Sequence, residues 1–283
     1  MNRVIVTPRD EEHWLAMRKN DVTSSDCHLM VGHAYELWQE KHCGVMRDFR
    51  DNIRIRCGNK LEAGIAELTQ EEFKLMPFRR FDEYIRIPEY RIGSSFDFQF
   101  EDETIYEIKQ VDQWIFKDNW VTGYPNAMPE KIEWQVQQQM FVSGRLRTIV
   151  GVLVGGNVPH IFVRYLQRPA VELMKKKAWE FWNAPCPDPL YEKDAKCIAK
   201  MHANVTTDTV HEIVEDDKLI GILEHYLTES ATESAAKKYK ESYKAQALEI
   251  IGESEKAKGC GFTVSAGKNK NGKRGFRVHR RGG

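Results

Sequence analysis

The spacing of hydrophobic and polar positions changes character along the chain. Up to about residue 70, apolar positions recur every three to four residues, which is typical of amphipathic helices. From Met76 to Val111 the apolar residues alternate with polar ones or run together, which indicates β-strands. Helical and strand periods then alternate from Pro129 to Asn183. The pattern predicts an α/β fold, in which helices pack on a sheet.

Capping residues and turn signals bound the predicted elements. Four helices are expected first, at 10–19, from 23 onward, at 34–42 and at 52–68. A β-meander follows, with strands at 78–87, 91–100 and 104–111. Residues 112–128 are expected to form a long loop rich in aromatic side chains. The remaining elements are a helix at 129–143, strands at 148–154 and 160–166, and a helix at 169–183.

Prolines at 185, 187 and 189 cannot continue the last of these helices and predict a boundary between domains 1–189 and 190–283. In the second domain, residues 210–233 carry seven acidic side chains and one lysine, whereas residues 258–283 carry eight Lys or Arg and no acid. The pattern predicts an acidic helical segment, a long helix over 231–252 and a basic β-hairpin that pairs 261–265 with 275–278. The basic end either adds sequence-independent affinity for nucleic acid or is held by the acidic segment.

Composition narrows the classes of protein to which the chain can belong. Its 42 Lys and Arg balance 42 Asp and Glu, which argues against a protein that coats nucleic acid through surplus positive charge. The longest apolar run, 149–154, is far shorter than the roughly 20 residues of a membrane span, so no membrane is expected as a partner. Six cysteines without metal-ligand spacing and a charged N-terminal segment predict a cytoplasmic location.

The predicted meander carries two carboxylates and a lysine. Glu107 and Lys109 are two residues apart on one strand and therefore share a face, and the preceding turn folds Asp97 back beside Glu107. Oxygen ligands of this kind suit Mg²⁺, and the lysine can orient or deprotonate an attacking water, which is chemistry suited to phosphodiester hydrolysis. The alternative is that Glu107 and Lys109 form a solvated pair.

Five motifs follow one another along the chain. They are Trp14 with Arg18 and Thr23-Ser24-Ser25-Asp26, Gly58-Asn59-Lys60-Leu61-Glu62, Ser94-Ser95-Phe96-Asp97, Glu107-Ile108-Lys109, and Trp134-Gln135-Val136-Gln137-Gln138-Gln139-Met140. In order and spacing they resemble the lambda exonuclease and YqaJ-like viral recombinase family, a branch of the PD-(D/E)xK nucleases. The resemblance extends from Trp14 to about Asn183. It implies an α/β fold with a restriction-endonuclease-like core, a central mixed β-sheet flanked by helices, and here a C-terminal helical extension and basic β-hairpin.

The resemblance assigns roles at the reacting phosphate. It implies that Asp97 and Glu107 are metal ligands, that Ile108 offers its carbonyl, and that Lys109 serves the attacking water. It also implies that Glu62 reaches a second ion, so that the cofactor is two Mg²⁺ or Mn²⁺ ions. The alternative for Glu62 is an exposed helix carboxylate.

Gln135 corresponds to a family residue that positions the scissile end, and the alternative is a solvated helix face shared with Gln137, Gln138 and Gln139. This chain departs from the family pattern in placing Phe96 and Phe98 beside Asp97, where Pro and Gly are common. Phenylalanine forbids the close backbone approach that glycine permits, which puts the local backbone path in question.

A second group of residues resembles the family's pocket for a terminal 5′-phosphate. Arg18 offers two charge-assisted hydrogen bonds, and Ser25 lies where Thr23-Ser24-Ser25-Asp26 opens a helix, a favourable place for an anion. Ser95 is a weaker phosphate candidate. The alternative for Arg18 and Ser25 is an ordinary helix cap beside a surface arginine.

The function expected from this resemblance is a metal-dependent 5′→3′ exonuclease on double-stranded DNA that leaves 3′ single strands for phage recombination. The implied partners are DNA ends, further copies of the chain in a ring-shaped trimer, and a phage single-strand annealing protein in the bacterial host. Two alternatives are an endonuclease or repair nuclease of the same superfamily and a non-enzymatic DNA-binding or annealing protein. The aromatic loop would stack on DNA or pack at a subunit contact, and packing is the more common fate of aromatic side chains.

Overall fold

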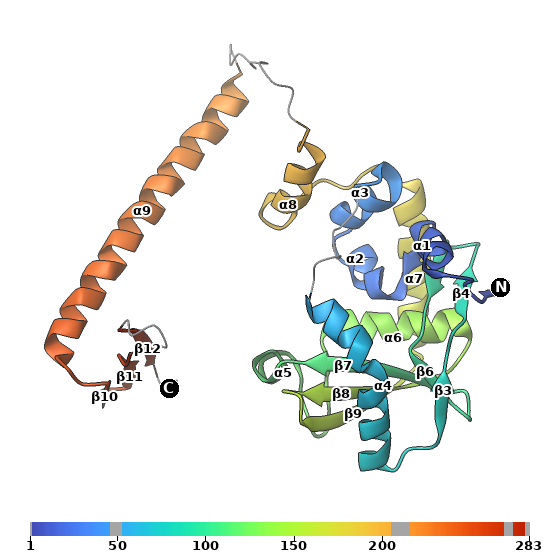
Figure 1. Cartoon of the computed structure of the whole chain (residues 1–283). Coiled ribbons are helices and arrows are strands. Elements are labelled where there is room, and N and C mark those ends of the chain that lie inside the picture. Colours follow the sequence, from blue (N-terminus) through green and yellow to red (C-terminus); the bar gives the residue numbers. More distant parts are fainter. Residues whose placement is uncertain (1, 46–52, 205–215, 269–273, 281–283) are drawn as a thin grey trace. The chain divides into compact units, whose positions relative to one another are not determined.

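A computed structural model of the chain describes residues 2–45, 53–204, 216–268 and 274–280 (Figure 1). It divides into two compact units, Met1–Val205 and Thr206–Gly283, each of which is considered by itself. The predicted boundary at 189 falls inside the first unit, because helix α8 (Tyr191–Met201) packs on α3 (Tyr35–Cys43). Asp194 anchors α8, since its carboxylate contacts His33 Nε2 at 2.6 Å and accepts a hydrogen bond from the backbone N–H of Leu190.

Two mixed sheets, rather than one, lie in the first unit. The larger has the order β3-β6-β7-β8-β9, in which only β7 and β8 are parallel. The smaller has the order β1-β4-β5-β2, in which only β5 and β2 are parallel. The strands are β1 (Val4–Val6), β2 (Val22–Thr23), β3 (Phe78–Arg80), β4 (Tyr84–Ile87), β5 (Ile92–Ser94), β6 (Phe98–Phe100), β7 (Ile105–Val111), β8 (Arg147–Val154) and β9 (Val158–Tyr165).

The predicted strands at 78–87 and 91–100 are each divided between these two sheets, which corrects the expectation of one continuous meander. The breaks lie opposite each other, because the N–H of Phe81 donates to the carbonyl of Asp97 at 3.2 Å. The rings of Phe81 and Phe96 stack there with centroids 4.3 Å apart, and both side chains are buried. Core packing at the break therefore accommodates the Phe96 side chain, and Asp97 still lies directly before β6.

Helices cover both faces of the larger sheet (Figure 1). Alternate residues of β8 belong to two hydrophobic clusters: Ile149 packs with Ile65 of α4 (Ile53–Phe73), and Val150 packs with Val136 of α6 (Glu130–Ser143). Burial on both faces explains why the sequences of β7 and β8 contain nearly continuous apolar runs. The remaining helices of this unit are α1 (Glu11–Lys19), the 3₁₀ helix η1 (Ser24–Asp26), α2 (Cys27–Val31), α5 (Gln113–Asn119) and α7 (Arg168–Asn183).

The expectation of a long loop at 112–128 is wrong, because it contains helix α5. Asp112 caps this helix by accepting a hydrogen bond from the N–H of Trp114 at 2.9 Å. Phe116 and Trp120 stack on each other and pack on Phe162 of the core. These two aromatic residues therefore pack within the first unit itself, whereas Trp114 is exposed.

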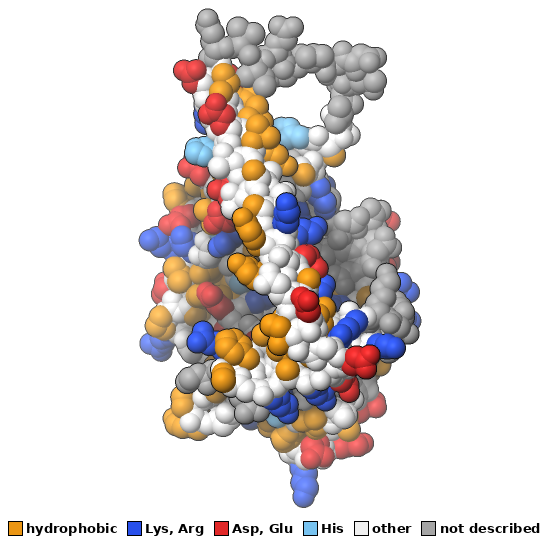
Figure 2. Space-filling model, turned by 90° about the vertical axis from the view of Figure 1, so that its left-hand side faces the viewer, with side chains coloured by type: hydrophobic (Ala, Val, Ile, Leu, Met, Phe, Trp, Pro, Cys, Tyr) orange, Lys and Arg blue, Asp and Glu red, His pale blue; other side chains and the backbone are white. Residues whose placement is uncertain are grey.

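The second unit consists of a long helix and a small antiparallel sheet. Helix α9 (Asp217–Ile251) begins at an Asp216 cap, fourteen residues before the predicted start at 231, and none of its residues, all of which are described, is buried. Apolar side chains lie exposed along it (Figure 2). The sheet has the order β10 (Lys256–Gly259), β11 (Phe262–Ser265), β12 (Arg277–Arg280).

The predicted pairing of the basic hairpin is confirmed for β11 and β12, and β10 is an additional strand that the sequence did not indicate. The turn at 269–273 and the acidic residues at 210–215 lie outside the described residues. Among the helices described, none is long and apolar enough to span a membrane.

Candidate active site

One large cleft in the first unit gathers the residues that the sequence singled out. Its cavity volume is about 1310 Å³. The residues come from α1, η1, α4, the segment between β5 and β6, strand β7 and α6, so only the folded chain brings them together. All nine predicted site residues line the cleft: Arg18, Ser25, Glu62, Ser95, Asp97, Glu107, Ile108, Lys109 and Gln135.

The strand pair β6 and β7 places the two acids and the lysine as predicted. Phe98 pairs with Tyr106, so Asp97, just before β6, lies opposite Glu107. Asp97 Oδ2 accepts a hydrogen bond from the N–H of Ile108 at 2.8 Å. The ammonium of Lys109 donates to Glu107 Oε1 and to the carbonyl of Ile108. The alternative of a solvated pair does not fit, because Glu107 is only 2% exposed.

Two glutamines of α6 also donate hydrogen bonds to the Glu107 carboxylate. Gln135 Nε2 donates to Glu107 Oε1 at 2.5 Å, and Gln139 Nε2 donates to Oε2 at 2.6 Å. The alternative of a solvated glutamine face is wrong, because all four glutamines are buried; Gln138, for example, donates to the carbonyls of Val22 and Gly93. Gln139 was missed as a site residue, although its spacing of four from Gln135 puts both on one helix face.

Glu62 approaches this cluster from α4 and is paired with an arginine. Arg80 Nη2 donates to Glu62 Oε1 at 3.3 Å, and the Glu62 side chain is 20% exposed. The alternative of an exposed helix carboxylate therefore does not fit. Arg80 was not anticipated, because no motif surrounds it and only the position of β3 beside α4 brings it to the cleft.

Burial and like charge control the ionisation of the cluster. Burial raises the pKa of Asp97 well above its usual range, and the nearby Glu107 carboxylate raises it further. Burial also raises the pKa of Glu62, although Arg80 opposes this shift. Burial by itself lowers the pKa of Lys109, but the carboxylates of Glu107 and Asp97 outweigh it and raise the pKa above its ordinary value. The cluster therefore favours a cation among its carboxylates.

A second hydrogen-bonded group that lines the cleft contains the other set of predicted residues. The guanidinium of Arg18 lies 4.3 Å from the centre of the Trp14 ring, and Nη2 donates to Ser25 Oγ at 3.4 Å. Trp14 Nε1 donates to Ser95 Oγ at 2.8 Å, which adds Ser95 to the same group. Trp14 thus holds both Arg18 and Ser95, a role that the sequence alone did not give it.

The segment at Ser25 differs from the helix opening that was predicted. It forms a three-residue 3₁₀ helix followed by the five-residue α2, too short for a large helix dipole. Thr23 makes no side-chain capping bond to the backbone; its hydroxyl contacts Ser25 Oγ and donates to Asp26 Oδ2. The ordinary-cap alternative therefore lacks its hydrogen bond, and any anion here would be held chiefly by Arg18 and the serine hydroxyls.

The atoms around Glu107 that could bind a metal ion are oxygens. In the described part of the chain, no three His, Cys, Asp or Glu side chains converge as a metal-binding group. The ammonium of Lys109, however, contacts Glu107 Oε1 and the Ile108 carbonyl, so these oxygens already stabilise a positive charge. Together with the half-buried carboxyl of Asp97, they are the hard ligands that Mg²⁺ or Mn²⁺ prefers.

The raised pKa of Asp97 has a consequence for stability. The folded chain binds the Asp97 proton more tightly than the unfolded chain, so its contribution to stability is fully present below the ordinary pKa and is lost as pH rises through the raised value. In chelator at pH 7, Asp97→Asn is therefore expected to raise the unfolding midpoint by a few degrees, at about 2–4 °C per kcal/mol.

Tryptophan fluorescence is suited to this measurement, because all seven tryptophans lie in the first unit. Asp118→Asn is the matched control, because Asp118 is exposed and outside the cleft. An Asp97→Asn protein that is no more stable than the wild type at pH 7, with the same pH dependence, would show that Asp97 is not destabilised by its surroundings.

The fold and the cleft define a class of protein, an α/β domain in which two carboxylates and a lysine meet on paired strands. Residues 13–146 match the family model of the YqaJ-like viral recombinase domain. The chain thus carries a YqaJ-like viral recombinase domain, and the resemblance predicted from its motifs is confirmed. No curated protein matches the chain.

Solved structures provide a comparison over more of the chain. An alkaline exonuclease from Laribacter hongkongensis, LHK-Exo, is similar over 68% of this chain and 98% of that one, with 16% identity and a TM-score of 0.50. LHK-Exo in complex with dAMP matches the same shares at 17% identity and a TM-score of 0.49. A phage-related exonuclease from Haemophilus somnus 129PT covers 64% of this chain and 96% of that one, with 13% identity and a TM-score of 0.42. The first comparison shows a shared fold and confirms a mixed α/β architecture.

Proposed function

We propose that the chain is a metal-dependent 5′→3′ exonuclease that acts on double-stranded DNA and leaves a 3′ single strand for recombination. One observation carries this proposal: the acid and lysine cluster at Glu107 and the Arg18 group line the same cleft. The first group has the chemistry to hydrolyse a phosphodiester, and the second has the chemistry to hold a terminal phosphate. A nuclease that removes nucleotides from a 5′ end needs the hydrolytic group and the phosphate-binding group in one cleft.

Each residue has a role in this proposal. Asp97, Glu107 and the Ile108 carbonyl would hold one Mg²⁺ or Mn²⁺ ion, and Glu62 would reach a second. When bound, such ions lower the pKa of a water and neutralise charge on the phosphate. Lys109, whose pKa is raised, acts as a hydrogen-bond donor that orients the attacking water or a phosphate oxygen.

Residues around this centre position it. Gln135 and Gln139 fix the orientation of the Glu107 carboxylate through one hydrogen bond to each oxygen. Gln135 also lines the cleft, where it can contact the scissile end. Trp14 fixes Arg18 by stacking, which limits the directions in which the guanidinium can receive a phosphate.

The wider setting follows from the family resemblance. The proposed partners are double-stranded DNA ends, two further copies of the chain in a ring-shaped trimer, and a phage single-strand annealing protein. The proposed location is the cytoplasm of a bacterial host, without membrane contact.

A comparison of linear and circular substrates tests the proposal. Purified protein with Mg²⁺ is expected to release mononucleotides from a linear duplex, starting at 5′ ends, and to leave a covalently closed circle intact. Cutting of the circle would support the endonuclease alternative. Absence of nucleotide release with Mg²⁺ and with Mn²⁺ would support the non-enzymatic alternative.

A further inference from the structure

The small sheet of the second unit has two chemically different faces. In antiparallel pairs, residues directly opposite each other point to the same side of the sheet. Thr263 of β11 lies opposite Lys258 and His279, and Ser265 lies opposite Lys256 and Arg277. One side therefore carries only cationic, hydroxyl and imidazole groups, which we name the basic face: Lys256, Lys258, Thr263, Ser265, Arg277 and His279.

The other side is mainly apolar. Phe262 lies opposite Arg280, and Val264 lies opposite Ala257 and Val278. Among the described residues of the three strands, Arg280 is the one basic side chain on this side, and its guanidinium lies 5.6 Å from the centre of the Phe262 ring. The alternation Arg277-Val278-His279-Arg280 in β12 thus places Arg277 and Arg280 on opposite faces of one strand.

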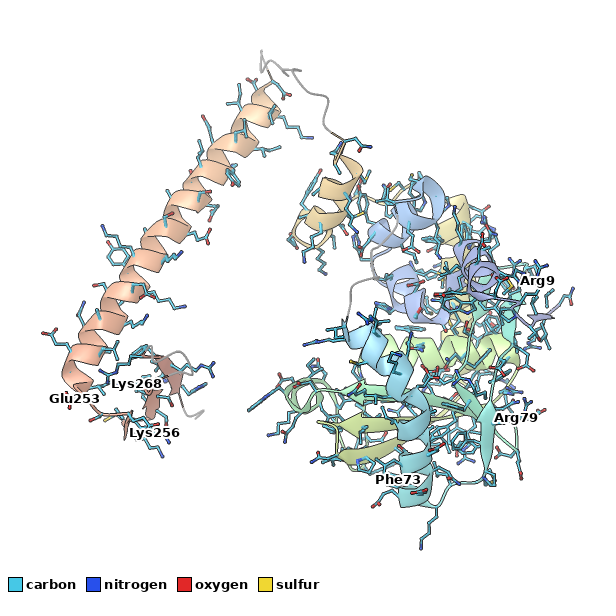
Figure 3. All side chains as sticks on the ribbon, in the orientation of Figure 1. Arg9, Phe73, Arg79, Glu253, Lys256 and Lys268 are labelled. Carbon is cyan, nitrogen blue, oxygen red and sulfur yellow. The ribbon has the colours of Figure 1, made fainter. Side chains whose placement is uncertain are left out.

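We propose that the basic face binds the phosphate backbone of DNA. Its cationic side chains are exposed, and residues 256–280 contain no Asp or Glu that could neutralise them within the sheet. Figure 3 labels Lys256, the first residue of β10, and Lys268, which follows β11. Ammonium, guanidinium and hydroxyl groups all donate hydrogen bonds to phosphate oxygens. The face has no Phe, Tyr or Trp ring among its six residues, and its contacts are mainly with phosphate, so the binding is expected to be largely independent of sequence.

Arg274 is excluded from this face by its hydrogen bonds. Its guanidinium donates to the carbonyl oxygens of Ala266, Gly252 and Ser254, at 3.0, 2.5 and 3.1 Å. These bonds tie the start of β12 to the end of α9. Arg274 is therefore a structural residue, and the cationic residues of the tail are not equivalent.

The choice of DNA as the partner rests on the proposed exonuclease function, which requires the protein to remain bound to a polyanion. The chain as a whole has no net charge, so this attraction must come from a local group of cations. A local cationic face in the second unit can supply that attraction through the release of counterions. The other anionic partner on the same chain is the acidic stretch of residues 210–233. Binding to that stretch would make the face insensitive to added DNA.

A pair of arginine variants in one strand tests the proposal. Arg277→Gln and Arg280→Gln remove the same charge from opposite faces of β12. Binding of full-length protein to fluorescent single-stranded and duplex DNA is measured in chelator over a range of salt concentrations. Arg277→Gln is expected to weaken binding about five- to tenfold and to reduce the salt slope by about 0.7 on single strands or 0.9 on duplex. Arg280→Gln is expected to change neither, and Arg277→Lys is expected to preserve the slope.

The triple variant Lys256→Gln, Lys258→Gln, Arg277→Gln is expected to reduce the slope by about three times as much. Equal effects of Arg277→Gln and Arg280→Gln would overturn the proposal, because the tail would then act only through its total charge. No effect of any variant would overturn it as well. Because binding is measured without divalent metal, a failure of the exonuclease proposal appears separately, as absence of nucleotide release by the wild-type protein.

Discussion

Lys109→Ala and Asp97→Ala proteins are each expected to lose nucleotide release by roughly 10³-fold or more while they remain folded. Lys109 makes its hydrogen bonds to Glu107 and Ile108 inside the cleft, so its removal leaves the hydrophobic clusters intact. The Asp97 carboxylate accepts a hydrogen bond from the N–H of Ile108 and supplies one of the oxygens proposed to bind metal. DNA binding should survive better than cleavage, because the substrate is held by other groups. Single-turnover digestion of a 5′-phosphorylated duplex, with Mg²⁺ varied, measures the loss.

Asp118→Ala is the control for this pair, because it removes an exposed carboxylate outside the cleft. It should leave turnover unchanged. Near-normal turnover of Lys109→Ala or Asp97→Ala, with the metal dependence of the wild type, would show that these residues do not take part in the reaction. Circular dichroism on all variants separates loss of chemistry from loss of fold.

Arg18→Ala is expected to slow cleavage of 5′-phosphorylated duplexes by about 10- to 150-fold and to change cleavage of 5′-hydroxyl duplexes little. The guanidinium adjoins Ser25 and is held over Trp14, so it can donate charge-assisted bonds to a terminal phosphate. The loss of such a contact is worth roughly 1.5–3 kcal/mol, which corresponds to that range. A terminal phosphate carries one more ionisable oxygen than an internal one, so the effect should be specific to phosphorylated ends. Initial rates on matched 5′-phosphate and 5′-hydroxyl substrates measure it.

Lys19→Ala is the matched control for Arg18→Ala, because Lys19 is the next residue of α1 but is exposed and does not line the cleft. It should leave the preference for 5′-phosphate ends intact. If Arg18→Ala slowed both substrates equally, or if the wild type preferred 3′ ends, Arg18 and Ser25 would not be an end-recognition pocket.

The carboxylate and lysine cluster was predictable from the sequence because its geometry is local. Asp97 and Glu107 are separated by one short turn, and antiparallel pairing of the flanking strands leaves no choice but to bring them together. The same locality explains why α1, α6, α7 and the pairing of β11 with β12 follow their predicted ranges closely. Helical and strand periods are properties of consecutive residues, so they can be read before the fold is known.

The partners of the cluster were beyond that local reasoning. Arg80 reaches Glu62, and Trp14 reaches Ser95, only because separate elements pack side by side. The glutamines of α6 fitted a solvated helix face because they are polar. The sequence does not show that backbone carbonyls of other elements accept hydrogen bonds from their amide groups. Helix α5 was not predicted because it is short and is flanked by residues typical of turns.

The sequence by itself therefore determined the α/β class, most elements, the acidic and basic segments of the C-terminal region and the candidate catalytic residues. The tertiary structure decided how the predicted meander divides into two sheets, which side chains support the cleft, and which residues of β10, β11 and β12 lie opposite one another in the small sheet. The reason is physical: periodicity and turn chemistry act over a few residues, whereas the strand breaks at Phe81 and Phe96, the hydrogen bonds of Glu107 and the register of β10 and β12 against β11 depend on contacts between separate segments.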